Sequence, residues 1–136
     1  EHNGALFTKE DVISITKVAK SSKTNENTIG KFGIGFKSVY AYTTDPKIYS
    51  GVYSFEIIDY IFPFEIPHEK THEGFTRIIL PFDHPEVSSE KAFKEISTAL
   101  KNQIKPESIL FLNCIDTLRI SIEGISSDIC IKKCRE

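Results

Sequence analysis

The sequence predicts an α+β fold, a two-layer sandwich in which helices cover one face of a mostly antiparallel, mixed sheet. Strand-like stretches alternate apolar and polar residues across short turns, as in Tyr53 to Ile58 after the turn at Ser50-Gly51. Helical stretches, with apolar residues three and four apart, stand elsewhere in the chain at 8–19 and 88–103. A length of 136 residues fits a single domain over residues 1–136.

The first helix is expected from Thr8 to about Ala19. Thr8-Lys9-Glu10-Asp11 fits a capping box, in which the Thr8 hydroxyl takes an N–H group of the first turn and the Asp11 carboxylate reaches back. One apolar stripe along this helix is expected to pack into the core: Val12, Ile15, Val18 and Ala19.

A polar run separates this helix from a cluster of glycines. Residues 21–28 are rich in Ser, Thr and Asn and show no periodicity, which predicts a loop. Such a loop is either a solvated linker or part of a lid, over about 20–33, that closes on a ligand.

The glycine cluster is the strongest local indication of chemistry. Gly30, Gly33 and Gly35 fall close together, and helical spacing begins at Phe36. Glycines let a backbone approach a ligand, and the N–H groups of a following helix favour an anion such as phosphate. The P-loop pattern fails because its Lys-Ser pair comes one residue late, and the dinucleotide fingerprint lacks its third glycine, at Ser38. A glycine-rich hinge without a ligand stays open at this point.

Three strands are expected in the middle of the chain. Lys47 to Ile58 fits two of them. Residues 61–67 contain Pro63 and Pro67, and proline cannot donate a backbone hydrogen bond to a neighbouring strand, so this segment is expected at a sheet edge or as a covering segment. Gly74 to Leu80 fits another strand. Three of its residues are expected on one face: Thr76, Ile78 and Leu80.

The last third of the chain predicts one helix and two strands. The helix is capped by Ser88 or Ser89 and runs to about Gln103. Its expected core stripe is Phe93, Ile96, Leu100 and Ile104. Leu110-Phe111-Leu112 is expected to be a buried anchor, and strands are expected at 117–123 and around Ile129 and Ile131.

Composition excludes several classes of function. A net charge of −2 and an isoelectric point near 6.1 favour no nucleic-acid partner, and no apolar run is long enough to span a membrane. Three cysteines without a CxxC pair predict buried or half-buried free thiols and a reduced, cytoplasmic setting. The absence of an initiator Met indicates a fragment of a larger protein.

The glycine segment Gly30-Lys31-Phe32-Gly33-Ile34-Gly35-Phe36-Lys37-Ser38 resembles the lid-and-glycine box of the GHKL ATPases. This Bergerat-fold superfamily includes gyrase B, MutL, histidine kinases and the ninety-kilodalton heat-shock chaperone, and the form found here looks most like the chaperone and sacsin branches. Asn3-Gly4 followed by Phe7 resembles the family's first glycine box, and Gly74 to Leu80 resembles the strand with its nucleotide-contacting threonine. The resemblance covers roughly residues 2–123.

The resemblance implies an ATP- or ADP-binding module whose parent protein is an ATPase of chaperone type. It implies nucleotide contacts from His2, Asn3, Gly4, Lys20, Ser21, Gly30, Phe32, Gly33, Ile34, Gly35, Phe36 and Thr76. Other domains of a larger protein are the implied partners. The family's catalytic glutamate and its Mg²⁺-holding asparagine precede the first glycine box. No catalytic or metal-ligating residue is therefore expected in this chain, Mg²⁺ is expected only in the complete domain, and this chain alone is not expected to hydrolyse ATP.

One departure from the family bears on which base is bound. The family usually has an aspartate for the adenine amino group where His2 stands. A neutral imidazole accepts a hydrogen bond through only one nitrogen and in only one tautomer, and Glu1 is the nearby alternative. The competing hypothesis is a degenerate Bergerat-like scaffold for protein–protein interaction without nucleotide. A conventional P-loop or kinase-type phosphotransferase is disfavoured by the failed spacing.

Overall fold

The computed structural model describes residues 1–16, 34–69, 74–112 and 115–133. The chain divides into two compact units, Glu1–Ser89 and Glu90–Glu136. The single domain expected over residues 1–136 stays a prediction.

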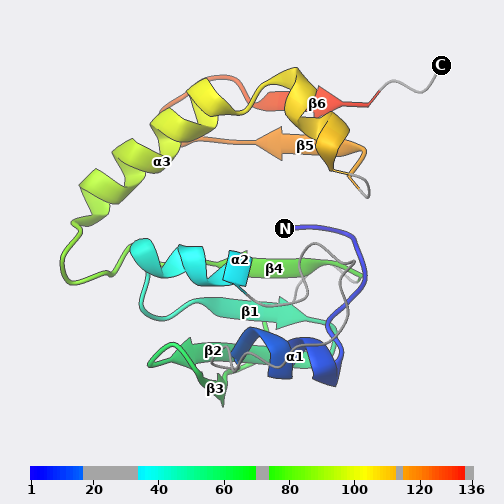
Figure 1. Cartoon of the computed structure of the whole chain (residues 1–136), viewed down its shortest axis with the longest axis vertical. Helices are drawn as coiled ribbons and strands as arrows, with labels where there is room; N and C mark the ends of the chain where they lie inside the picture. The colour runs from blue at the N-terminus through cyan, green and yellow to red at the C-terminus, as the bar shows by residue number, and fades with distance from the viewer. Residues whose placement is uncertain (17–33, 70–73, 113–114, 134–136) are drawn as a thin grey trace. The chain divides into compact units, whose positions relative to one another are not determined.

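The first unit is built on a four-stranded antiparallel sheet (Figure 1). Its strands, in chain order, are β1 (Lys47–Ser50), β2 (Tyr53–Ile58), β3 (Phe62–Glu65) and β4 (Thr76–Ile79). They lie in the order β3-β2-β1-β4. The predicted turn between β1 and β2 is confirmed, and Gly51 in it has φ of 58°, a conformation that costs a glycine little.

Helices cover one face of this sheet. They are α1 (Lys9–Thr16), α2 (Ile34–Lys37) and the 3₁₀ helix η1 (Ser38–Ala41). Ile15 of α1 joins three strand residues in the buried core: Ile48, Phe55 and Ile57. Partly buried residues pack against that cluster from the three helices, from the strands and from the segment before α1: Phe7, Val12, Phe36, Tyr40, Tyr53 and Ile78. The predicted α+β class, with a mostly antiparallel sheet, is confirmed.

The predicted capping box opens α1. The Asp11 carboxylate accepts hydrogen bonds from the Thr8 backbone N–H (2.8 Å) and hydroxyl (2.9 Å), and the Asp11 N–H donates to the Thr8 hydroxyl oxygen (3.3 Å). These bonds, the backbone one first, lower the pKa of Asp11. The part of the expected helix beyond Thr16 lies outside the described residues.

Strand β3 is the edge strand that Pro63 and Pro67 predict within 61–67. The Ile66 N–H donates to the Ser54 carbonyl oxygen (3.0 Å), just beyond the paired residues of β2 and β3. Because hydrogen-bonded pairs alternate along an antiparallel ladder, the nitrogen of Pro63 points away from β2, where no donor is missed. The same proline removes a donor from the open edge and so opposes the addition of another strand.

The second unit contains α3 (Ser89–Gln103), which begins at the junction of the units, the 3₁₀ helix η2 (Pro106–Phe111), and the antiparallel pair β5 (Thr117–Ile120) and β6 (Ile129–Lys132). The predicted helix and both predicted strands are confirmed. Four residues of these elements are buried: Ala92, Ser97, Ile109 and Ile120.

Three expectations about burial in this unit are wrong. Leu110 and Phe111 are 66% and 84% exposed, because a 3₁₀ helix repeats every three residues and Ile109 occupies its inward position. Phe93 is exposed because α3 buries Ala92 and Ser97 instead. Cys130 is an exposed free thiol, since Ile129 and Ile131 take the inward positions of β6.

Candidate functional site

The N-terminal segment lies along the outer edge of β4. The His2 N–H donates to the Thr76 carbonyl oxygen (2.9 Å), and the Thr76 N–H donates to the His2 carbonyl oxygen (2.8 Å). These bonds form an antiparallel bridge, so the two side chains lie on the same face of the sheet. Two segments that the sequence placed at one nucleotide site, the first glycine box and the Thr76 strand, are therefore neighbours.

The Thr76 side chain is fully buried and belongs to a chain of hydrogen bonds. Its hydroxyl oxygen lies 2.6 Å from that of Ser50, which is paired with Thr76 across β1 and β4 and is 1% exposed. The Ser50 oxygen also accepts the Phe7 N–H (2.8 Å). His2, Thr76 and Ser50 thus form a polar row across three neighbouring segments, on the face that the helices cover.

Ser50 is the functional candidate that the sequence reasoning missed. The pattern at Ser50-Gly51 predicts a turn, and turns are usually polar. One signal was present, because Ser50 follows Ile48 at the spacing that puts both on one face of a strand. A serine on an otherwise apolar face needs a partner, and the partner is Thr76.

The His2 ring folds over the glycine that follows it. The Gly4 N–H donates to His2 Nδ1 (3.2 Å), and a Cβ on Gly4 would lie only 3.2 Å from the same nitrogen. Glycine therefore gives the ring room. Asn3 lies between these two residues and is exposed.

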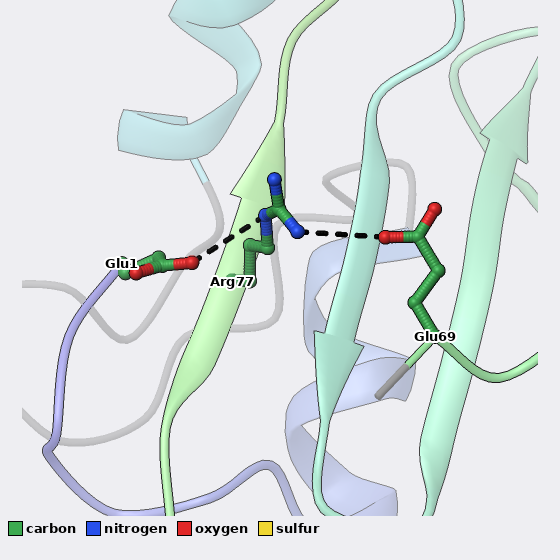
Figure 2. A network of polar contacts seen from close by, with 3 residues as sticks. All are labelled: Glu1, Glu69 and Arg77. Atoms are coloured by element: carbon green, nitrogen blue, oxygen red, sulfur yellow. Dashed lines mark hydrogen bonds and ion pairs between the residues drawn. The ribbon is translucent and has the colours of Figure 1, made fainter. Parts of the chain in front are cut away.

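The opposite face of the sheet carries charges (Figure 2). Arg77 alternates with Thr76 along β4, and its guanidinium lies between the carboxylates of Glu1 (3.4 Å) and Glu69 (3.5 Å). Tyr49 is buried on this face, and its pKa is raised by burial and then by the neighbouring Glu69 carboxylate. Glu1 is the alternative partner for the adenine amino group. Its ion pair with Arg77 lies on the face of the sheet opposite to the row of His2, Thr76 and Ser50.

The glycine segment is described from Ile34 onward. Gly35 is exposed within the single turn of α2, and a Cβ placed on it would meet no atom within 4 Å. Its carbonyl oxygen accepts the Ser38 hydroxyl (2.8 Å). Phe36 packs against the core and lies edge-on to Tyr40, so packing explains this residue without a ligand. Five predicted nucleotide contacts lie outside the described residues: Lys20, Ser21, Gly30, Phe32 and Gly33.

Neither a membrane-spanning helix nor a metal-binding cluster occurs among the described residues. None of the helices in those ranges is long and apolar enough to cross a membrane. Across 1–16, 34–69, 74–112 and 115–133, no group of three or more His, Cys, Asp and Glu side chains is arranged to hold a metal ion.

Comparison with known proteins gives a family match and a match to one curated protein. The model of a family described as the Sacsin domain matches residues 1–78. Human sacsin is 47% identical over 51 residues, which are 37% of this chain and 1% of the human protein. The chain therefore covers a very small part of that relative. No solved structure matches significantly.

Proposed function

The chain belongs to the Sacsin domain family, and we propose that it is the nucleotide-binding module of a sacsin-like GHKL ATPase, with ATP or ADP as its ligand. The nucleotide base lies at the row of His2, Thr76 and Ser50. The phosphates lie against the glycine segment that ends at Gly35, and Lys20 and Ser21 contribute from the phosphate side. The segment over about 20–33 closes over the ligand as a lid.

One observation carries this proposal: the antiparallel pairing of His2 with Thr76. Two segments distant in sequence, assigned to the base end of one pocket by resemblance alone, lie side by side on the helix-covered face. Thr76 is fully buried there and its hydroxyl belongs to a hydrogen-bonded pair, so its orientation is restricted before any ligand arrives.

The glycine segment supports the phosphate side of the proposal. Gly35 is exposed and has open space where a Cβ would be, so nothing in the described fold requires glycine at this position. Close approach of a ligand is a reason for glycine that does not depend on the fold.

Calorimetric titration of the 136-residue chain with ATP and ADP tests the proposal. We expect saturable binding, and at least about tenfold weaker binding by Thr76→Val, which corresponds to the loss of one or more hydrogen bonds. Thr43→Val is the matched control, because Thr43 is equally buried and its hydroxyl oxygen has no partner among the described residues. Absence of saturable binding by the unaltered, folded chain overturns the proposal, as does equal affinity in the two variants.

A scaffold without nucleotide is the second candidate, and the exposed apolar residues of the second unit favour it. Phe111 and Leu110 are largely exposed next to the buried Ile109. Exposed apolar clusters on soluble proteins often mark interaction sites. The same titration separates the two functions, since a scaffold leaves ATP and ADP unbound. In either case, we propose that this module acts with other domains of a larger, cytoplasmic protein.

A further inference from the structure

A hollow beside the turn between β1 and β2 has a volume of about 660 Å³, within the range of small-molecule sites. Ser54 of β2 and His68, which follows β3, both line it. Phe55 and Ile57 of β2 pack in the core under the helices, so the alternation of a strand places Ser54 on the opposite face. The hollow shares no residue with the proposed nucleotide site, and what it does is independent of nucleotide binding.

The hydroxyl of Ser54 is hydrogen-bonded to the ring of His68. Ser54 Oγ lies 2.7 Å from His68 Nδ1, and Ser54 is 8% exposed. The Ile66 N–H donates to the Ser54 carbonyl oxygen (3.0 Å), which continues the pairing of β2 with β3 and brings the segment with His68 alongside Ser54. With the ring proton on Nε2, the Ser54 hydroxyl donates to Nδ1, and the ring can take up that proton. A hydroxyl within hydrogen-bond reach of such a base is the arrangement of an activated nucleophile.

The surroundings of Ser54 fit an apolar ester. Val52, Ile66 and Pro67 line the hollow, and apolar walls around a few polar groups favour an apolar ligand. Gly51 and Val52 form the turn at its border, and strand pairing begins only beyond them, so the ladder does not use their N–H groups. Backbone N–H groups that a ladder leaves free are suitable donors to the negative oxygen that develops during acyl transfer.

We propose that Ser54 is a nucleophile that accepts the acyl group of an apolar ester, with His68 as its base. Ser54 Oγ attacks the carbonyl carbon of the ester, and its proton passes to His68 Nδ1. The bond to the alcohol oxygen then breaks and the alcohol leaves with that proton, so the acyl group stays on Ser54. Water attacks the acyl-serine, a proton of the water passes through Nδ1 to Ser54 Oγ, and the carboxylic acid is released.

Treatment of the full 136-residue chain with a fluorophosphonate tests for the activated serine. This reagent phosphonylates such a hydroxyl with loss of fluoride, and peptide mass spectrometry locates the adduct. We expect the adduct on Ser54 and not on Ser97, which is similarly buried at 9% exposure but donates its hydroxyl to the Phe93 carbonyl oxygen. An unmodified Ser54 in the folded chain overturns the proposal, as does labelling of Ser97 to the same extent.

Hydrolysis of p-nitrophenyl butyrate assigns the roles of the two residues. Glutamine retains an acceptor for the hydroxyl but does not take up a proton, so His68→Gln should release p-nitrophenolate at least about 100-fold more slowly. Ser54→Ala should lose turnover. His84→Gln is the matched control and should keep the parental rate, because His84 Nδ1 is also hydrogen-bonded, to the Glu86 N–H at 3.2 Å, outside the hollow. A parental rate in His68→Gln contradicts base catalysis, and a parental rate in Ser54→Ala contradicts the nucleophile.

Discussion

Ser50 and Thr76 share a hydrogen bond of 2.6 Å across β1 and β4, and between them they anchor the N-terminal segment. Ser50 accepts the Phe7 N–H, and Thr76 exchanges both backbone bonds with His2. The position of the first glycine box therefore depends on two buried hydroxyl residues of the sheet.

Replacing Ser50 by alanine is expected to destabilise the first unit by about 1–3 kcal/mol. The change leaves the Phe7 N–H and the Thr76 hydroxyl oxygen without this partner in a buried place, and an unsatisfied buried group costs about that much. Urea denaturation followed by circular dichroism measures the effect. Thr43→Val, which removes a buried hydroxyl that lacks a described partner, should be neutral or stabilising. Equal midpoints of urea denaturation for Ser50→Ala and Thr43→Val would contradict the role given to Ser50.

Alanine at two glycines should have opposite consequences for stability. Gly51 has φ of 58°, and a Cβ there would lie 3.2 Å from Leu6 Cδ1, so Gly51→Ala should cost roughly 1–2 kcal/mol. Gly35 lies in α2 with open space around it, and Gly35→Ala should be neutral or stabilising by up to about 1 kcal/mol. Thermal unfolding of the two variants measures the difference in their stability.

The Gly35 variant also tests the phosphate loop. If Gly35→Ala keeps the stability of the parent chain and binds nucleotide much more weakly, the added methyl group acts on the ligand. Unchanged affinity in this folded variant would count against contact between Gly35 and phosphate. A loss of affinity together with a loss of stability would show that a methyl group at position 35 disturbs the fold itself, contrary to the open space around Gly35.

Short sequence patterns predicted most of the fold, because each pattern specifies a turn, a helix end or a strand edge within a few residues of itself. Thr8 and Asp11 form their capping box, Gly51 turns the chain between β1 and β2, and Pro63 lies at a sheet edge. The contact between Ser50 and Thr76 could not be predicted, since it depends on the register of β1 against β4. The exposure of Phe111 was missed because a 3₁₀ turn buries one position in three, and apolar character alone does not say which.

The candidate site was predicted unevenly for a related reason. Resemblance placed His2 and Thr76 together, and their pairing is now seen. It also gave Phe36 a ligand contact, which stays a prediction, and the structure shows Phe36 packed against the core. The bond from the Gly4 N–H to His2 Nδ1 lies at the level of single atoms, and no sequence pattern specifies it.

The Asp11 cap predicts a dependence of stability on pH. Bonds to Thr8 lower the pKa of Asp11 in the folded chain, so the ionised carboxylate stabilises the fold above the unfolded pKa, near pH 4. This contribution is lost as the pH falls through the lower, folded pKa. Asp11→Asn should therefore cost about 0.5 kcal/mol at pH 6, since the group is exposed, and progressively less as the pH falls through the folded pKa. Glu10→Gln removes a charge from the same turn without removing the Thr8 bonds, so its cost should be smaller at pH 6.

Ile109 and Phe111 provide the sharpest test of the second unit, because two apolar residues in one 3₁₀ helix have opposite environments. Ile109 is 2% exposed and Phe111 is 84% exposed. Truncating a buried isoleucine loses its transfer free energy and leaves a cavity, so Ile109→Ala should cost about 2–5 kcal/mol. Phe111→Ala should change stability by no more than about 0.5 kcal/mol, since its side chain is already in water. Urea denaturation of both variants, followed by far-ultraviolet circular dichroism, measures the difference.

The outcome also bears on what the exposed residues do. If Phe111→Ala proves as costly as Ile109→Ala, then Phe111 is packed in solution and the buried anchor expected from the sequence is restored. If Phe111→Ala keeps the stability of the parent chain and the protein becomes more soluble, the phenylalanine is exposed at a cost to solubility. An exposed phenylalanine that does not stabilise the fold is available for contact with another protein or domain. The scaffold function would then have a defined surface on which to act, independent of the result at the nucleotide site.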